Sequence, residues 1–172
     1  LKIIKGPDLP TGGIIMGSDG IAKAYSTGRG SVVVRGRVDI EEDKKGRETI
    51  IVSEIPYQVN KAALVTRIAD MVNNKELEGI AELRDESDRS GLRIVIRPKK
   101  DANNNIILNQ LYKHTPLQTS IGIIQLALVN NGPKVLDLKG LLSNYILHRK
   151  VVVTRRTQFE LKRAEERAHI LQ

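Results

Sequence analysis

The stretch from Asp137 to Gln172 constrains the fold most, because it predicts one uninterrupted helix. No proline interrupts it, and its one glycine, Gly140, falls in the opening turn. The carboxylate of Asp137 is placed to cap that turn. Apolar residues then recur at the spacings of one helical face, and they are Leu142, Ile146, Val153, Leu161, Ala164, Ala168 and Leu171. At 1.5 Å per residue the helix is about 50 Å long, so we expect it to project from its domain.

The two ends of the chain suggest a piece of a larger protein. Leu1 is not an initiator methionine, and no start signal precedes it. The predicted helix reaches Gln172 without a glycine, asparagine or proline to end it. We therefore expect this sequence to be one part of a longer chain.

Composition limits the class of protein. Aromatic residues make up only 3% of the 172 residues, so the core must consist of Ile, Leu and Val. The absence of cysteine excludes disulfides and thiolate zinc sites. No apolar run has membrane-spanning length, and no signal-peptide layout is present, so we expect a cytoplasmic protein. The net charge of +8 suits a polyanionic partner such as nucleic acid.

The rest of the chain alternates strands and helices. We expect helices from Ser18 or Asp19 to Gly28, from Asn60 through Val72, and from Asp101 or Asn103 through Tyr112. The expected strands are Ser31–Glu42, Arg47–Ile55, Leu77–Glu86, Leu92–Pro98, Thr119–Val129 and Lys134–Leu136, with turns at 43–46, 88–91 and 130–133. Tight turns between strands predict an α+β fold, in which helices flank one face of a mostly antiparallel sheet. We predict a domain at 1–136 and a long helix at 137–172.

The chain shows no complete active site. Each of its tyrosines could attack a phosphodiester, but each also sits where a half-buried ring would pack, and they are Tyr25, Tyr57, Tyr112 and Tyr145. The histidines are scattered, and no Ser–His–Asp or HExxH pattern occurs. We therefore predict no catalytic residue in this chain.

An acidic cluster offers a competing interpretation. Asp85, Glu86 and Asp88 are oxygen ligands of the kind that Mg²⁺ takes, and they would make a metal-dependent nuclease. They lie at a predicted hairpin tip between Arg84 and Arg89, which would offset their charge. We favour a solvated, self-paired loop over a metal site.

Basic residues give a better-supported hypothesis. From His148 to Arg156 the long helix carries Arg149, Lys150, Arg155 and Arg156 with no acid. Such residues can contact phosphates without reading base sequence. Beyond Phe159, glutamates can pair with the bases, which favours a solvated face there. A second basic group contains Arg29, Arg35 and Arg37, with Arg35 and Arg37 expected on one strand face. Because aromatic residues are few, duplex backbone contact is favoured over base stacking.

Several stretches resemble the A subunits of bacterial type II topoisomerases, nearer to the gyrase type than to the topoisomerase IV type. They are TIIVSEIPYQVNKA at 49–62, EGIAELRDESDRSG at 78–91, LNQLYKHT at 108–115, HRKVVVTRRT at 148–157 and EERAHIL at 165–171. The likeness covers nearly the whole chain, in order. It implies the tower (shoulder) domain of that family, followed by the first helix of a long coiled coil.

The resemblance also implies what this chain lacks. The family's catalytic tyrosine lies upstream of Leu1, so none of the tyrosines here inherits its role. Mg²⁺ and ATP would act through the partner B subunit, and no cofactor is expected in this part. The implied partners are duplex DNA, a second A subunit, and the B subunit, with no membrane.

The implied role is to hold the arms of a cleaved duplex and to link the cleavage core to a coiled-coil gate. The predicted DNA contacts are Arg29, Arg35, Arg37, Lys61, Arg149, Lys150, Arg155 and Arg156. Lys61 is included because it opens a helix, a setting that suits anions. The alternative is a purely structural spacer.

Overall fold

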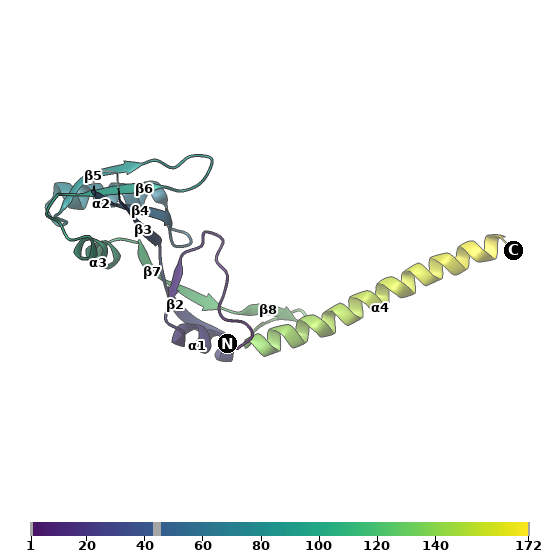
Figure 1. The fold of residues 1–172 in the computed structure, drawn as a ribbon. Helices are drawn as coiled ribbons and strands as arrows, with labels where there is room; N and C mark the ends of the chain where they lie inside the picture. The colour runs from purple at the N-terminus through teal and green to yellow at the C-terminus, as the bar shows by residue number, and fades with distance from the viewer. Residues whose placement is uncertain (1, 43–45, 172) are drawn as a thin grey trace. The chain divides into compact units, whose positions relative to one another are not determined.

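The structure is a computed structural model that describes residues 2–42 and 46–171. Figure 1 shows its helices and strands in chain order. They are β1 (Ile14–Met16), α1 (Asp19–Thr27), β2 (Arg29–Arg35), β3 (Arg37–Glu42), β4 (Glu48–Glu54), α2 (Lys61–Asn73), β5 (Ile80–Asp85), β6 (Ile94–Pro98), α3 (Asn104–His114), β7 (Gln118–Ile124), β8 (Leu126–Val129), β9 (Gly132–Val135) and α4 (Leu138–Leu171).

The chain divides into two compact units. Unit 1 comprises residues 1–21 and 31–122, and unit 2 comprises residues 22–30 and 123–172. The predicted domains at 1–136 and 137–172 stay a prediction. The α+β class with antiparallel strands and a long C-terminal helix is confirmed.

The core of unit 1 lies between the four-stranded sheet β3-β4-β6-β5 and the helices α2 and α3. Alternate residues of β4 and β6 point into it, as the pleat requires. The cluster is aliphatic, as the composition predicts, and its central members are Ile50, Val52, Leu64, Ile68, Met71, Ile94, Ile96, Ile107 and Leu111. Because residues of both helices join one cluster, we conclude that α2 and α3 cover the same face of this sheet.

The caps of α2 and α3 follow the sequence. The side chain of Asn60 accepts a hydrogen bond from the Ala63 N–H at 3.0 Å, and Asn103 caps α3 in the same way. Each asparagine keeps an extended backbone while its side chain binds an N–H group that the first turn leaves free. Both predicted helix starts are therefore confirmed.

The prediction of one strand over Ser31–Glu42 is wrong. The chain forms β2 and β3, which belong to different sheets and meet at Gly36. The Gly36 N–H donates to the Leu117 carbonyl oxygen at 2.8 Å. A Cβ at Gly36 would lie 2.6 Å from the Glu54 carbonyl oxygen, so only glycine fits this crossing point.

The prediction of one strand over Thr119–Val129 is also wrong. It divides at Gln125 into β7, in the sheet β1-β2-β7, and β8, in the two-stranded sheet β8-β9. The backbone groups of Gln125 bind residues outside both strands. Its N–H donates to the Gly28 carbonyl oxygen, and its carbonyl oxygen accepts from the Leu136 N–H. The described residues thus form three sheets, where the sequence predicted one.

The hairpins are closer to expectation. β3 pairs antiparallel with β4, although the predicted turn at 43–46 lies largely outside the described residues. β8 pairs with β9 through Asn130 and Asn131, whose φ angles are +53° and +63°. Two successive residues with positive φ make the tight turn that suits the twist of a hairpin. Apart from glycine, asparagine is the residue that adopts positive φ most readily.

Unit 2 ends in α4, the long helix that the sequence predicts. Its start is capped as expected, because Asp137 Oδ1 accepts from the Gly140 N–H at 2.8 Å. None of the described residues of α4 is buried, and on the predicted apolar face Leu142 is 48% and Leu161 57% exposed. No described helix combines the length and apolar character needed to cross a membrane.

Candidate nucleic-acid interface

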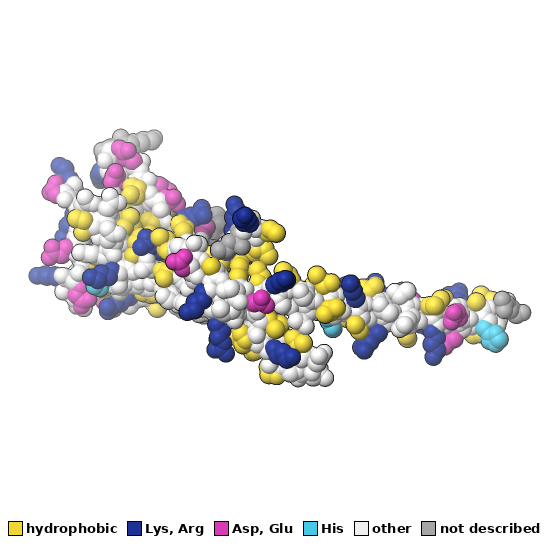
Figure 2. Space-filling model, turned by 90° about the horizontal axis from the view of Figure 1, so that it is seen from below, with side chains coloured by type: hydrophobic (Ala, Val, Ile, Leu, Met, Phe, Trp, Pro, Cys, Tyr) yellow, Lys and Arg dark blue, Asp and Glu magenta, His cyan; other side chains and the backbone are white. Residues whose placement is uncertain are grey.

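The basic segment of α4 presents free cations to solvent. Arg149, Lys150 and Arg155 are exposed, and none of them forms an ion pair with another described residue. Arg149 and Arg156 are separated by two turns, so their side chains leave the helix in nearly the same direction about 10 Å apart. Figure 2 shows Lys and Arg side chains at intervals along the helix, with hydrophobic side chains between them.

Acidic residues enter the helix after this segment. Arg156 lies 3.9 Å from Glu160, and Lys162 lies 3.9 Å from Glu166, each at the i,i+4 spacing. The Arg163 guanidinium lies 5.8 Å from the centre of the Phe159 ring. Exposed pairs of this kind contribute little stability, but they place an acid beside the base. The expectation of a mixed, self-paired face beyond Phe159 therefore agrees with the contacts.

Arg29 belongs to unit 2, and its backbone is hydrogen-bonded to the side chain of Thr27. Its N–H donates to Thr27 Oγ1 at 3.2 Å, and its carbonyl accepts from the same hydroxyl at 2.8 Å. The preceding Gly28 has φ +76°, and a Cβ there would lie 2.4 Å from the Leu136 carbonyl oxygen. The Arg29 side chain is exposed and has no ion-pair partner among the described residues.

The predicted contacts in unit 1 have partners within that unit. Arg35 donates to Gln118 Oε1 and lies 4.6 Å above the Tyr112 ring. Arg37 lies 3.5 Å from a Glu54 carboxylate oxygen. The prediction that Arg35 and Arg37 share one strand face is wrong, because the break at Gly36 places them in different sheets.

Lys61 also has an acidic partner. Its Nζ lies 2.7 Å from Asp85 Oδ2. The hydrogen bond from Lys61, with those from the Ser87 hydroxyl and N–H, lowers the pKa of Asp85 to about 2. The roles proposed for Arg35, Arg37 and Lys61 in DNA contact stay predictions, and each would have to leave or share its present partner.

The acidic residues between β5 and β6, Glu86 and Asp88, also have partners close by in the fold. Glu86 pairs with Arg84 at 3.2 Å and Arg93 at 3.4 Å. Asp88 accepts from Ser90, which lowers the pKa of its carboxyl. Among the described residues no three His, Asp or Glu side chains are placed to hold a metal ion. The contacts agree with a self-paired loop, except that Arg93 and Lys61 supply the partners and Arg89 does not.

The tyrosines differ in their surroundings. Tyr112 is partly buried beneath Arg35, and burial raises the pKa of its hydroxyl. Tyr145 is 62% exposed on α4. The expectation of a half-buried, packed ring is therefore wrong for Tyr145, because no described element covers this part of the helix.

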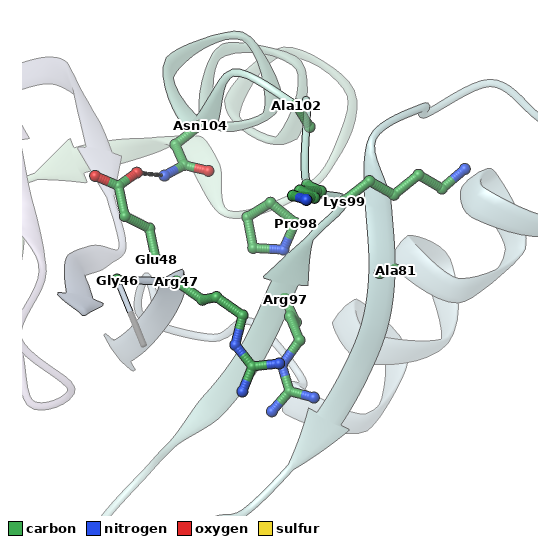
Figure 3. A pocket seen from close by; sticks show the side chains of 10 residues that line it. Gly46, Arg47, Glu48, Ala81, Arg97, Pro98, Lys99, Ala102 and Asn104 are labelled. Carbon is green, nitrogen blue, oxygen red and sulfur yellow. Dashed lines mark hydrogen bonds between the residues drawn. The ribbon is translucent and has the colours of Figure 1, made fainter. Parts of the chain in front are cut away.

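The predicted set omits four cations that line a pocket of about 760 Å³ in unit 1, and these are Arg47, Arg97, Lys99 and Lys100. The pocket lies where β4 begins and β6 ends. The signal in the sequence is the run Arg97-Pro-Lys-Lys100, in which three of four residues are basic. Figure 3 shows the side chains of Arg47 and Arg97 extending in the same direction, while Glu48 and Asn104 meet on the other side.

The chain matches the family of DNA gyrase and topoisomerase IV A subunits over residues 1–172. It is 60% identical over 169 residues to the A subunit of DNA gyrase from Clostridium acetobutylicum, covering 98% of this chain and 20% of that protein. It is 59% identical to the same protein of Halalkalibacterium halodurans and 54% identical to that of Staphylococcus aureus, covering all of this chain and 20% of each. The chain thus spans about a fifth of the length of these curated relatives. It belongs to the family of DNA gyrase and topoisomerase IV A subunits.

Proposed function

We propose that the chain is the tower part of the DNA gyrase A subunit, with the first helix of its coiled coil. The parent enzyme would be an ATP-dependent type II topoisomerase, which passes one duplex through a transient double-strand break in another and alters supercoiling. This part would hold the arms of the cleaved duplex without sequence preference and link the cleavage core to the coiled-coil gate. The proposal places it in the bacterial cytoplasm, on the nucleoid.

One observation carries the DNA-binding role. The segment 148–156 of α4 has four exposed Arg and Lys side chains and no acid, in a member of this family. Three of the four, Arg149, Lys150 and Arg155, have no ion-pair partner among the described residues. When such cations bind phosphates, counterions condensed on the DNA are released, and that release drives non-specific binding. An enzyme that acts at many sites gains from contacts that ignore base sequence.

The predicted DNA contacts can be ranked by whether each cation already has a partner within the protein. Arg29, Arg149, Lys150 and Arg155 have no ion-pair partner among the described residues, so they come first. Arg156 follows, because its contact with Glu160 is long and exposed. Arg35, Arg37 and Lys61 come last, because each already binds a side chain of unit 1.

Two triple variants of α4 test the role. R149Q/K150Q/R155Q and K162Q/R163Q/R167Q each replace one lysine and two arginines of the same exposed helix, so both remove the same charge. We expect the first to weaken duplex binding and to reduce the slope of log K against log salt by about 2–3. The second should leave binding nearer to wild type, because Glu160, Glu165 and Glu166 already offset that segment. Fluorescence anisotropy of a labelled duplex at several salt concentrations measures both.

Equal losses in the two variants would mean that general charge, rather than the segment 148–156, sets the affinity. Unchanged binding in both would favour the alternative function, a spacer between the cleavage core and a coiled coil. That alternative is favoured by the length of α4 and by its many exposed apolar residues. The same part of the topoisomerase IV A subunit, which belongs to a decatenase, is the alternative parent, since the family includes both enzymes.

Besides the B subunit, the proposed holoenzyme contains a second copy of the A subunit. Mg²⁺ and ATP would act through the B subunit. No catalytic residue is assigned here, so we expect the isolated chain neither to cleave nor to relax DNA. A plasmid relaxation assay with the chain alone and Mg²⁺ checks this, and cleavage that D85N abolishes would revive the nuclease interpretation.

A further inference from the structure

The net charge of the chain is concentrated in unit 2. Residues 22–30 and 123–172 contain eleven Lys and Arg against four Asp and Glu, a net charge of +7. The rest of the chain contains seventeen Lys and Arg against sixteen Asp and Glu, a net charge of +1. Unit 2 therefore carries nearly all of the net charge of +8 on about a third of the residues. A charge distributed in this way attracts a polyanion to one unit in preference to the other.

Four cations of unit 2 lie outside α4 or at its very start, far from the basic segment 148–156, and they are Lys23, Arg29, Lys134 and Lys139. All four are exposed, and none forms an ion pair with another described residue. The one acid of unit 2 that precedes Glu160 is Asp137, and its Oδ1 accepts from the Gly140 N–H at 2.8 Å to cap α4. These cations therefore have no ion pair to give up before they bind a phosphate.

Backbone contacts join the loop after α1 to the segment between β9 and α4. A Cβ at Gly28 would lie 2.4 Å from the Leu136 carbonyl oxygen, so the two segments are packed against each other. Gln125 connects them as well, because its N–H donates to the Gly28 carbonyl oxygen at 2.8 Å and its carbonyl oxygen accepts from the Leu136 N–H at 3.0 Å. Gly28 and Leu136 are therefore held side by side.

Three of the four cations surround this contact. Arg29 directly follows Gly28, while Lys134 lies two residues before Leu136 and Lys139 three residues after it. No more than about 11 Å of chain separates any of them from the contact. Over that length a duplex presents about six phosphate charges, at one per about 1.7 Å of its axis. The three cations are thus close enough together to meet one stretch of duplex.

We propose that Arg29, Lys134 and Lys139 form a second duplex-contact surface of unit 2, and that unit 2 rather than unit 1 carries the DNA affinity of this chain. The inference rests on the proposed function and adds two lysines that the predicted set omits. Lys139 lies about 15 Å along α4 from Arg149, which is less than half of one duplex turn of about 34 Å. One bound duplex can therefore contact both basic surfaces. Lysine and arginine contacts to phosphate read no base sequence.

Two triple variants compare the units. R29Q/K134Q/K139Q in unit 2 and R67Q/K99Q/K100Q in unit 1 each replace one arginine and two lysines, all of them exposed and without an ion-pair partner among the described residues. Fluorescence anisotropy of a labelled duplex at several salt concentrations is the measurement. We expect the first variant to reduce the slope of log K against log salt by about 3, since each lost phosphate contact removes about 0.9. The second should bind as wild type does.

Two double variants separate charge from folding. K134Q/K139Q leaves Arg29 in place and should reduce the slope by about 2. K134R/K139R keeps both charges and should retain the slope of wild type. Circular dichroism of each variant checks that the fold is intact. A loss in K134R/K139R as large as that in K134Q/K139Q would mean that the lysines act through the fold, and this would overturn the inference.

The remaining outcomes distinguish this inference from the proposed function. Wild-type binding by R29Q/K134Q/K139Q, together with a loss in R149Q/K150Q/R155Q, would overturn the inference and leave the proposed function standing. An equal loss in R67Q/K99Q/K100Q would also overturn it, because the affinity would then not be confined to unit 2. The absence of duplex binding by the wild-type chain at low salt would overturn the proposed DNA-binding role, and this inference with it.

Discussion

Gly36 is the position where one added methyl group should reveal how the chain passes between sheets. In G36A the new Cβ would lie 2.6 Å from the Glu54 carbonyl oxygen and 2.6 Å from Leu117 Cδ1. Contacts to carbon are optimal near about 3.5–4.0 Å, so the neighbours would have to move by about 1 Å. Leu117 is fully buried and its carbonyl accepts the Gly36 N–H, while Glu54 is held in β4 opposite Arg37 of β3. Both neighbours are therefore fixed by other contacts.

The expected cost is that of overpacking a closed site, about 1–3 kcal/mol of the free energy of unfolding. For a chain of this size each kcal/mol lowers Tm by about 2–4 °C. Urea denaturation followed by circular dichroism measures the change. The control is G122A in β7, where a Cβ would meet nothing within 4 Å and φ is not positive. That variant should be neutral or stabilised by up to about 1 kcal/mol. Equal stability of G36A and wild type would refute the close-approach argument.

Two further predictions concern the cap of α2 and the contact between Asp85 and Lys61, and three variants test them. N60A removes the oxygen that accepts the Ala63 N–H and should cost about 1 kcal/mol in urea, while N60D, which keeps an acceptor, should stay within a few tenths; equal stability of the two would argue against the cap. The pKa of Asp85 falls from 3.8 to about 2, so its contribution to stability is present above pH 3.8 and is lost as the pH falls through about 2. D85N has no such titration, so the urea midpoint of wild type should fall further than that of D85N over this range, and parallel curves would mean that the contact with Lys61 does not stabilise the fold.

Local signals in the sequence were enough for the helices and the tight turns. Asn60 and Asp137 start α2 and α4 by binding N–H groups three residues ahead, so the signal and its effect lie in one stretch of sequence. The pair Asn130-Asn131 marks a hairpin for the same reason. These elements follow from propensity and capping, which need no knowledge of the rest of the fold.

The division into three sheets could not be predicted in this way. The alternating pattern of apolar residues continues through Gly36 and Gln125, although the chain changes sheets at both. The partners that decide the change are distant in sequence, namely Leu117 and Glu54 for Gly36, and Gly28 for Gln125. A glycine in a strand pattern is a known sign of a close backbone approach, so Gly36 could have been suspected, whereas Gln125 carries no such sign.

Partners that are distant in sequence also decide which basic residues are paired with a carboxylate and which are not. A net charge of +8 indicates an anionic partner but not its location. In unit 1, Arg37 of β3 pairs with Glu54 of β4, and Lys61 of α2 pairs with Asp85 of β5. Arg93 binds Glu41 through both of its terminal nitrogens. Such a cation gains less from a phosphate, because it must first give up a partner that it already has.

On α4 the balance is reversed. The carboxylates of this helix begin only at Glu160, so Arg149, Lys150 and Arg155 have no ion pair with another described residue to give up before they meet a phosphate. Their full charge is available to displace counterions, and the salt dependence of binding should come mainly from them. These cations lie within a helix that runs from Leu138 to Leu171, so their spacing along a bound duplex would be set by the helix itself. Under the proposed function, unpaired cations on one helix are the feature that would let this part hold a duplex without reading its sequence.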